Sequence, residues 1–148
     1  MKWHDVLNYA KNGSPAPETR VEKTEAQWKA LLNDTEFYIT RKKGTEHAWG
    51  GEYCEAHDPG LYTCRCCDSL LFDATEKFES GSGWPSFTIP VRDNAIKYEK
   101  DNAHGMVRVE VMCNVCDAHL GHVFQDGPPP TGLRYCINSA SIKLRTNV

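Results

Sequence analysis

The sequence of 148 residues has no long apolar run and no excess of charge of one sign. No stretch approaches the ~20 apolar residues that a membrane-spanning helix requires. Lys and Arg number 17 against 20 Asp and Glu, so the formal net charge is −3. This balance gives no electrostatic reason to expect nucleic acid or an anionic membrane as a partner. The first residues, MKWHDVLNYAKNG, lack the apolar core of a signal peptide.

Cysteine is frequent, yet the chain has too few cysteines for a small disulfide scaffold. There are seven, an odd number, and two pairs have the C-x-x-C spacing. In a chain without an export signal, this pattern favours metal or redox chemistry over a disulfide framework. We therefore expect a cytoplasmic protein, with one main domain that is long enough to bury a core.

The N-terminal part of the chain differs from the rest in its pattern of residues. Residues 1–23 contain turn signals such as Asn12-Gly13 and a short helical pattern over Asp5–Lys11. We expect them to form a surface arm, and residues 24–148 to form the main domain. No function is assigned to the arm.

The main domain begins with helical signals. Thr24-x-x-Gln27 is a capping-box pattern, typical of a helix start, and apolar residues follow it at helical spacing. The pattern predicts a helix over about residues 25–33 and a second short one over 35–42.

After residue 44 the sequence pattern predicts short strands separated by Gly, Pro, Asp and Asn. In Met106–Met112 the valines alternate with Arg108 and Glu110, as expected of a half-buried antiparallel strand. The fold class predicted is mainly β, with two antiparallel sheets and short N-terminal helices, clipped by a four-cysteine zinc site. The expected strands are Leu61–Arg65, Leu70–Phe72, Phe87–Val91, Ile96–Glu99, Met106–Met112, His119–Phe124, Leu133–Ile137 and Ser141–Leu144.

The zinc prediction rests on two cysteine knuckles, Cys64/Cys67 and Cys113/Cys116. Two such turns supply the four sulfurs that a tetrahedral Zn²⁺ ion favours, and a site closed by four thiolates is structural. The alternative is that one C-x-x-C is a thioredoxin-like redox pair, but neither lies at a clear strand-to-helix junction. Cys66 has no assigned role, and a free buried thiol is the simplest explanation for it.

Cys136 is the candidate nucleophile. It lies in a predicted strand, so Arg134 and Asn138 share its face. A guanidinium beside a thiol stabilises the thiolate and lowers the pKa of the cysteine. The competing interpretation is that Cys136 is a small buried hydrophobe, as lone cysteines usually are.

Two histidines, His119 and His122, precede this strand. A histidine can hold or deliver a proton near neutral pH, which suits chemistry beside a thiol. They could also bind a second, catalytic metal with Asp126, but that spacing is a weak signal. The run Ser80–Phe87 presents Trp84 on a glycine-rich loop, where the indole is either a core residue or the wall of an apolar pocket.

These runs together resemble one family. GTE…GEY, KFESGSGWPSF, EVMCNVC, HLGHVFQDGP and GLRYCINSAS are similar to motifs of the B-type methionine sulfoxide reductases, in their zinc-containing form. The resemblance spans about residues 24–145. It implies a fold of two antiparallel sheets and reduction of the R epimer of methionine sulfoxide, in proteins and possibly also free, as part of protein repair under oxidative stress.

The resemblance also implies roles for individual residues. Cys136 would attack the sulfoxide sulfur, release methionine and become a sulfenic acid. Arg134 would hold the thiolate, His119 and His122 would engage or protonate the sulfoxide oxygen, and Trp84 would pack on the ε-methyl group. Asn138 and Asp126 would be supporting polar residues, and the one zinc ion would be held by Cys64, Cys67, Cys113 and Cys116.

The chain departs from some members at the resolving cysteine, because Ser82 occupies that position in the SGxGWPSF loop. Cys54 resembles the alternative position used by other members, and is favoured over Cys66, which lies between zinc ligands. A Cys54–Cys136 disulfide would then be reset by thioredoxin. Direct reduction of the sulfenic acid by another thiol stays open, and we expect a monomer.

Two other functions compete with this interpretation. A zinc-stabilised β domain that binds a partner would explain the four cysteines, but would leave Cys136 and the histidine pair without a purpose. A metal-dependent hydrolase would use His119 and His122 and would hold two metal ions per chain rather than one.

Overall fold

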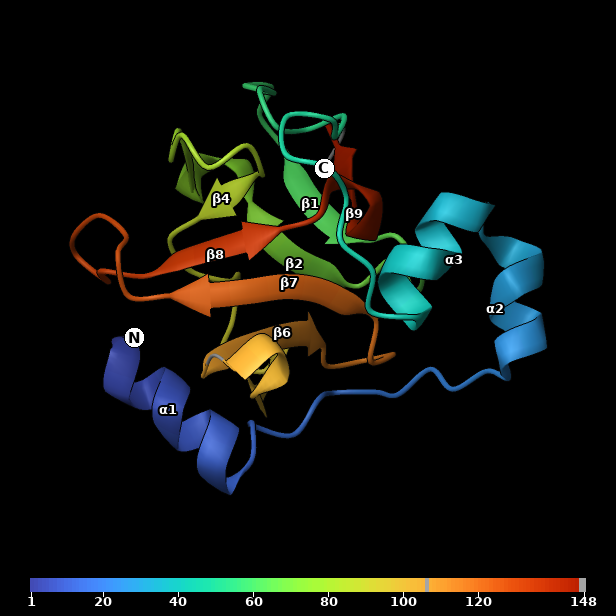
Figure 1. The fold of residues 1–148 in the computed structure, drawn as a ribbon, viewed down its shortest axis with the longest axis horizontal. Coiled ribbons are helices and arrows are strands. Elements are labelled where there is room, and N and C mark those ends of the chain that lie inside the picture. Colours follow the sequence, from blue (N-terminus) through green and yellow to red (C-terminus); the bar gives the residue numbers. More distant parts are fainter. Residues whose placement is uncertain (106, 147–148) are drawn as a thin grey trace.

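The computed structural model describes residues 1–105 and 107–146 and contains two antiparallel sheets (Figure 1). The strands are β1 Leu61–Cys64, β2 Leu70–Asp73, β3 Lys77–Phe78, β4 Ser86–Phe87, β5 Ile96–Asp101, β6 Arg108–Cys113, β7 His119–Phe124, β8 Arg134–Ile137 and β9 Ile142–Arg145. One sheet has the order β2-β1-β9 and the other the order β3-β4-β8-β7-β6-β5. The predicted fold class, mainly β with two antiparallel sheets and N-terminal helices, is confirmed.

The helices are α1 Trp3–Asn12, α2 Glu25–Leu31 and α3 Asp34–Arg41, and α2 begins directly after the capping pattern predicted at Thr24. The Thr24 hydroxyl accepts the backbone N–H of Gln27, and the Gln27 side chain accepts the N–H of Thr24 at 2.8 Å. Asn33 and Glu36 form the same reciprocal pair at the start of α3. Each pair satisfies two backbone donors that have no partner within the helix.

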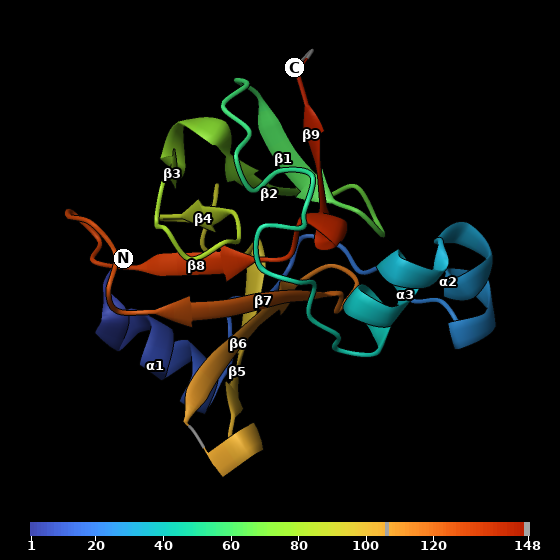
Figure 2. The same cartoon turned by 45° about the horizontal axis from the view of Figure 1, so that its top comes forward.

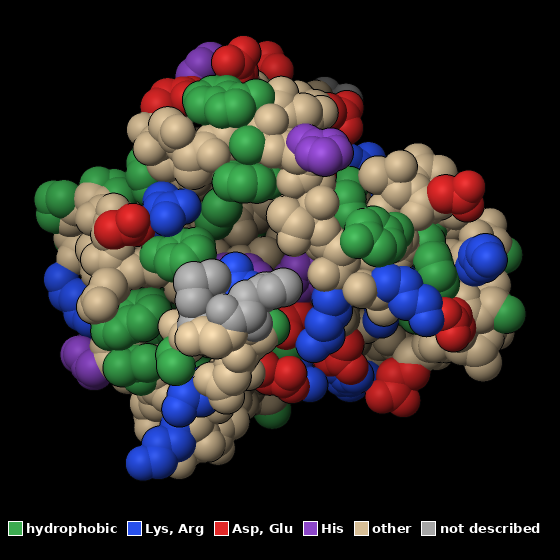
Figure 3. All heavy atoms as spheres, viewed as in Figure 1, with side chains coloured by type: hydrophobic (Ala, Val, Ile, Leu, Met, Phe, Trp, Pro, Cys, Tyr) green, Lys and Arg blue, Asp and Glu red, His purple; other side chains and the backbone are tan. Residues whose placement is uncertain are grey.

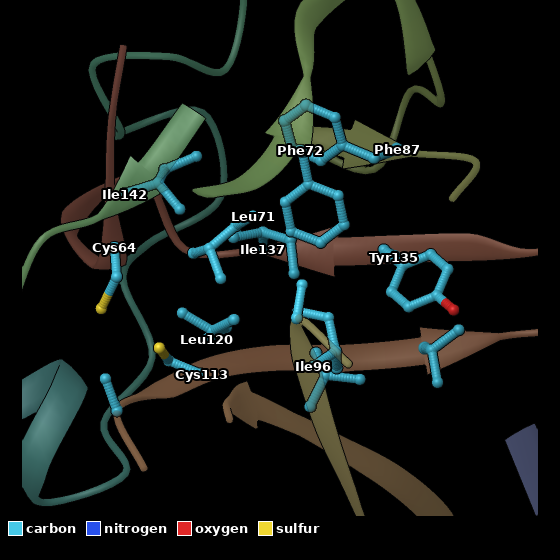
Figure 4. Close-up of a cluster of buried hydrophobic side chains, with 14 of the residues drawn as sticks. Cys64, Leu71, Phe72, Phe87, Ile96, Cys113, Leu120, Tyr135, Ile137 and Ile142 are labelled. Carbon is cyan, nitrogen blue, oxygen red and sulfur yellow. The ribbon is translucent and has the colours of Figure 1, made fainter. Parts of the chain in front are cut away.

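The core lies between the two sheets, and aromatic side chains dominate it. Phe72 of β2 stacks on Phe87 of β4 with ring centroids 4.4 Å apart, and Tyr62 of β1 meets Phe87 edge-on. Figure 4 shows these phenylalanines above Ile137 of β8, with Leu120 of β7 nearby. All of them are fully buried, and each of the phenylalanine, isoleucine and leucine side chains contributes about 1.5–3 kcal/mol of transfer free energy to folding.

The N-terminal segment packs on the larger sheet. Helix α1 lies against β5 and β6 (Figure 2). Its Val6 side chain is fully buried. The chain then runs back to the second cysteine knuckle, where the Val21 N–H donates to the Val115 carbonyl at 2.9 Å. Gly13, with a φ of 108°, ends the helix as its turn signal indicated.

Two details of the predicted strands are wrong. The strand predicted over Phe87–Val91 is present only as Ser86–Phe87 in β4, since Pro90 has no N–H to donate to a ladder. In the strand predicted over Met106–Met112, Val107 was expected on the buried face, but it precedes β6 and is 74% exposed. Glu110 was expected on the solvent face, but it is only 4% exposed and binds His119. Met106 lies outside the described residues. None of the helices within the described residues has the length and hydrophobicity of a membrane span.

Candidate functional site

Cys136 lies at the centre of the larger sheet, between two neighbouring strands. In the register of the sheet it faces His122 of β7 on one side and Ser86 of β4 on the other. It lines a pocket of about 120 Å³. Figure 3 shows this face of the molecule hollowed, with histidine and basic side chains visible inside the hollow. The pocket side chains used below are Cys136, His119, His122, Trp84, Asn138 and Arg108.

Gly121 explains how β7 and β8 approach so closely here. A Cβ atom at this position would collide with the backbone carbonyl of Cys136. Only glycine therefore allows the two histidines of HLGH to lie beside the cysteine strand.

His119 is buried and paired with a carboxylate. Its Nδ1 lies 2.7 Å from Oε2 of Glu110, and the other oxygen of Glu110 accepts from the Lys43 ammonium at 3.0 Å. Burial raises the pKa of Glu110, but the hydrogen bonds from His119 and Lys43 outweigh it and hold that pKa below the usual value. Glu110 is therefore ionised and accepts the Nδ1 hydrogen, which leaves Nε2 available to a pocket ligand.

His122 has a separate carboxylate and the opposite arrangement. Its Nε2 lies 2.8 Å from Oδ2 of Asp101, which also accepts from Arg108 at 3.3 Å. The hydrogen bond from His122 and the backbone N–H of Ala103 lower the pKa of Asp101 to about 2. Asp101 thus takes the Nε2 hydrogen and leaves Nδ1 as the available nitrogen. Burial, opposed only in part by Asp101, lowers the pKa of His122, so the ring is neutral near pH 7.

The environment of Cys136 differs from the one predicted. Burial raises the pKa of the thiol above its ordinary value, although Arg134 and a hydrogen bond from Ser82 act in the opposite direction. Arg134 lowers the pKa of the thiol, as the sequence indicated, but the desolvation of the thiolate outweighs the effect of the guanidinium. Cys136 rests as a thiol.

Arg134 and Asp126 form a pair at the edge of this site. The guanidinium donates to both carboxylate oxygens of Asp126, from Nε at 2.9 Å and from the terminal nitrogen at 3.3 Å, and it stacks over Phe124. The Asp126 side chain is 65% exposed and lines a neighbouring cavity rather than the pocket of Trp84. The pair thus places a positive charge near Cys136 without closing the pocket.

Asn138 and Trp84 form two further parts of the pocket. Asn138 is buried, and its side chain donates to the Leu120 carbonyl at 3.1 Å. The Trp84 indole donates to the backbone carbonyl of Glu46 at 3.1 Å, which holds the ring on the pocket wall. Trp84 is half-buried, so part of its face is available to a ligand.

Cys54 does not line the pocket, and all seven cysteines are free. Its side chain is 7% exposed, and burial raises the pKa of its thiol. The Lys77 ammonium donates to the Cys54 and Ala56 carbonyls at 3.3 and 2.9 Å and fixes the surrounding loop. Ser82, on the glycine-rich loop, forms a hydrogen bond with the Ser80 hydroxyl at 2.8 Å.

The four predicted metal ligands lie together at one end of the sheets. The sulfurs of Cys64, Cys67, Cys113 and Cys116 all lie within 4.8 Å of one another. Cys64 and Cys116 are 3.7 Å apart at sulfur, and Cys67 and Cys113 are 3.6 Å apart. Tetrahedral coordination with metal–sulfur bonds of about 2.3 Å requires sulfurs about 3.8 Å apart. The cluster therefore fits a metal ion.

The backbone of the two knuckles is equivalent. Asp68 donates its N–H to the Cys64 carbonyl at 2.9 Å, and Asp117 donates to the Cys113 carbonyl at 2.8 Å. Both aspartates adopt the left-handed conformation, with φ of 67° and 65°. Within this repeated turn Cys64 and Cys67 take the same places as Cys113 and Cys116, so Cys66 is outside the four-sulfur cluster.

Sequence reasoning missed the carboxylates behind the histidines. Glu110 was expected on a solvent face and Asp101 was not considered, yet each accepts a hydrogen bond from one pocket histidine. Arg108 and Lys43, which bind these carboxylates, were missed too. The available signal was Glu110 inside the valine-rich run of β6. A carboxylate that is buried among apolar residues requires a hydrogen-bond partner, so its position indicates a polar partner nearby.

Known proteins that are similar in sequence cover most of this chain. The model of the SelR domain family matches residues 32–146. A peptide methionine sulfoxide reductase MsrB of Herminiimonas arsenicoxydans is 55% identical over 124 residues, which cover 84% of this chain and 90% of that protein. The proteins of the same name from Saccharophagus degradans and Acinetobacter baylyi are 56% and 53% identical, over 84% and 86% of this chain and 92% of each relative.

Proposed function

The chain belongs to the SelR domain family of peptide methionine sulfoxide reductases and is thus an oxidoreductase, and we propose that it reduces the R epimer of methionine sulfoxide in oxidised proteins and peptides. The family resemblance of the sequence is confirmed. The observation that carries the substrate proposal is that a thiol, two histidines and an indole line one pocket. This combination supplies a nucleophile, proton carriers and an apolar wall.

The first step transfers oxygen from the substrate to Cys136. The sulfur attacks the sulfoxide sulfur, and the thiol proton moves to the sulfoxide oxygen. Neutral His122 faces Cys136 and offers Nδ1 for that proton, so it serves as the carrier between the two atoms. Once the sulfoxide oxygen carries that proton, it donates a hydrogen bond to the free Nε2 of His119. The products are methionine and a Cys136 sulfenic acid, and no external proton is consumed.

The remaining pocket residues hold the substrate. Trp84 packs on the ε-methyl group, and its fixed position beside Cys136 supports a choice between the two epimers. Asn138 supports the polar side of the pocket. Arg134, held by Asp126, stabilises negative charge on the Cys136 sulfur as it develops.

The second step regenerates the thiol. The Cys54 thiol attacks the sulfenic acid, water leaves, and a Cys54–Cys136 disulfide forms. Thioredoxin, a dithiol reductant, then exchanges with this disulfide and restores both thiols. The support for Cys54 is its family position, its place in a glycine-containing loop and its freedom from the four-sulfur cluster.

The four-cysteine cluster holds one structural zinc ion in this account. Its donor set of four thiolates is the one that zinc favours, and no ligand position is left for substrate. Bound zinc would join the turn after β1 to the turn after β6, which residues 68–112 separate in the sequence. The chain's own residues in the pocket perform the chemistry.

Trapping the intermediate tests this function. A Cys54→Ser variant is mixed with a peptide that carries the R epimer, without reductant, and a carbon nucleophile that captures sulfenic acids is then added. We expect one adduct per chain, located on the peptide that contains Cys136, together with an equal amount of reduced substrate. Unchanged substrate and an unmodified Cys136 would overturn the proposal.

A further inference from the structure

We propose that Glu46 is a positioning residue of this pocket, which holds Trp84 and Asn138 in place around Cys136. The inference rests on the proposed reductase function and assigns a role to the GTE…GEY segment, which that function leaves without one. Glu46 does not line the pocket, whereas its neighbour Thr45 does. Glu46 therefore acts through other residues.

The side chain of Glu46 binds the chain directly after the nucleophile strand. One carboxylate oxygen accepts the N–H of Ser139 at 2.8 Å, and the other accepts the N–H of Ala140 at 3.0 Å. These two amides begin the short helical turn Ser139–Ser141, for which Asn138 provides no side-chain cap. Glu46 thus supplies the cap from a distant part of the sequence.

This cap leaves the Asn138 side chain free for the pocket. The Asn138 side-chain oxygen accepts the backbone N–H of Glu46 at 3.1 Å, and its nitrogen donates to the Leu120 carbonyl. The backbone carbonyl of Glu46 accepts the Trp84 indole N–H. One residue therefore binds both Trp84 and Asn138, and its carboxylate fixes the position from which it does so.

The surrounding loop has little room to relax. A Cβ atom on Gly51 would collide with the Glu46 carboxylate and the Ser139 side chain, which explains the glycine of GEY. The Tyr53 N–H donates to the Ser139 hydroxyl at 3.1 Å. On the Trp84 side, the Trp49 N–H donates to the Gly83 carbonyl at 2.7 Å.

Glu46 is not a proton donor or acceptor for the substrate in this arrangement. Both of its carboxylate oxygens are occupied by backbone N–H groups. Loss of the carboxylate leaves two amides without their acceptor and releases the Glu46 backbone. We expect Trp84 to lose its fixed orientation, which weakens substrate binding more than it slows the bond-forming step.

The test compares Glu46→Ala and Glu46→Gln with a control, Glu52→Gln. Glu52 lies on the same loop, and its exposed carboxylate accepts from Arg65, which also donates to the Ser139 carbonyl, but it does not bind the backbone amides of residues 139–140. The indole N–H signal of Trp84, assigned with a Trp84→Phe variant, is followed by NMR. The KM and kcat for an oxidised peptide are measured with dithiothreitol as the reductant.

We expect Glu46→Ala to move the Trp84 indole signal and to raise KM about tenfold with a smaller change in kcat, as the loss of hydrogen bonds to a charged group implies. Glu46→Gln keeps one acceptor oxygen and should change both less, and Glu52→Gln should change neither. If the wild type is active and Glu46→Ala has the wild-type KM, the inference is overturned but the proposed function is not. An inactive wild type would overturn the proposed function and the inference with it.

Discussion

Cys136 and His122 face each other on adjacent strands of the larger sheet. The thiol has a raised pKa and the imidazole a lowered one, both chiefly because of burial. Near pH 7 the pair therefore holds one proton on sulfur and a lone pair on the ring. Reduction of a sulfoxide requires that proton to reach the sulfoxide oxygen as sulfur attacks, and a neutral ring beside the thiol can carry it.

Asp101 fixes the His122 tautomer and should therefore affect both the pH dependence and the rate of the reaction. Activity should fall with decreasing pH as His122 becomes protonated, at a pKa below the ordinary histidine value. Asp101 raises that pKa, so Asp101→Asn should move the acid limb to lower pH. The maximal rate should drop by at least about tenfold, since an amide can donate to Nε2 and reverse the tautomer. Single-turnover rates across the acid range measure both effects.

Glu99→Gln is the matched control for this variant, because Glu99 is an exposed acid on the same strand β5. It should leave the profile unchanged. An Asp101→Asn enzyme with the wild-type rate and acid limb would show that His122 does not carry the proton.

Arg134 and Asp126 should shift the reactivity of Cys136 in opposite directions. Arg134 lowers the pKa of the thiol and Asp126 raises it. Arg134→Gln should therefore slow alkylation of Cys136 at a fixed pH below its pKa, and Asp126→Asn should accelerate it. The rate of iodoacetamide labelling against pH, read by mass spectrometry of the Cys136 peptide, gives both pKa values. Shifts of the same sign in the two variants would contradict this electrostatic role.

Cys54→Ser separates the two halves of the catalytic cycle. The first turnover should stay near the wild-type rate and yield about one methionine per chain, as expected when only the resolving thiol is lost. Recycling by thioredoxin should be much slower. Cys66→Ser, a second free thiol outside the four-sulfur cluster, should recycle normally. Normal recycling of Cys54→Ser would assign the resolving role to another thiol.

The four-cysteine cluster predicts a loss of stability rather than of chemistry. Metal binding contributes roughly 10 kcal/mol or more in small zinc domains, and this is folding free energy. Cys113→Ser should therefore lose zinc and lower the melting temperature or prevent soluble expression, whereas Cys66→Ser should keep one zinc ion per chain. Metal content and thermal unfolding report both. A soluble, fully stable Cys113→Ser protein without metal would contradict a structural zinc site.

Local patterns in the sequence predicted much of the fold. The capping box at Thr24 and the alternation in β8 depend on neighbouring residues only, and both were confirmed. The paired C-x-x-C spacing likewise led to the four sulfurs of the cluster. The strand predicted from Phe87 to Val91 failed, because a non-local partner decides how far a strand extends.

The site was less predictable, for a physical reason. The pKa of Cys136 depends on its burial as well as on its charged neighbour, and burial was not readable from the sequence. The hydrogen bonds from His122 to Asp101 and from Ser139 to Glu46 join residues far apart in the chain. Such contacts are determined by the register of the strands and the path of the loops.

The most direct test of this account is turnover of each methionine sulfoxide epimer, separately, in a peptide with dithiothreitol, beside a Cys136→Ser control. We predict reduction of the R epimer alone and its complete loss in Cys136→Ser. Equal turnover of both epimers, or activity that survives in Cys136→Ser, would contradict it.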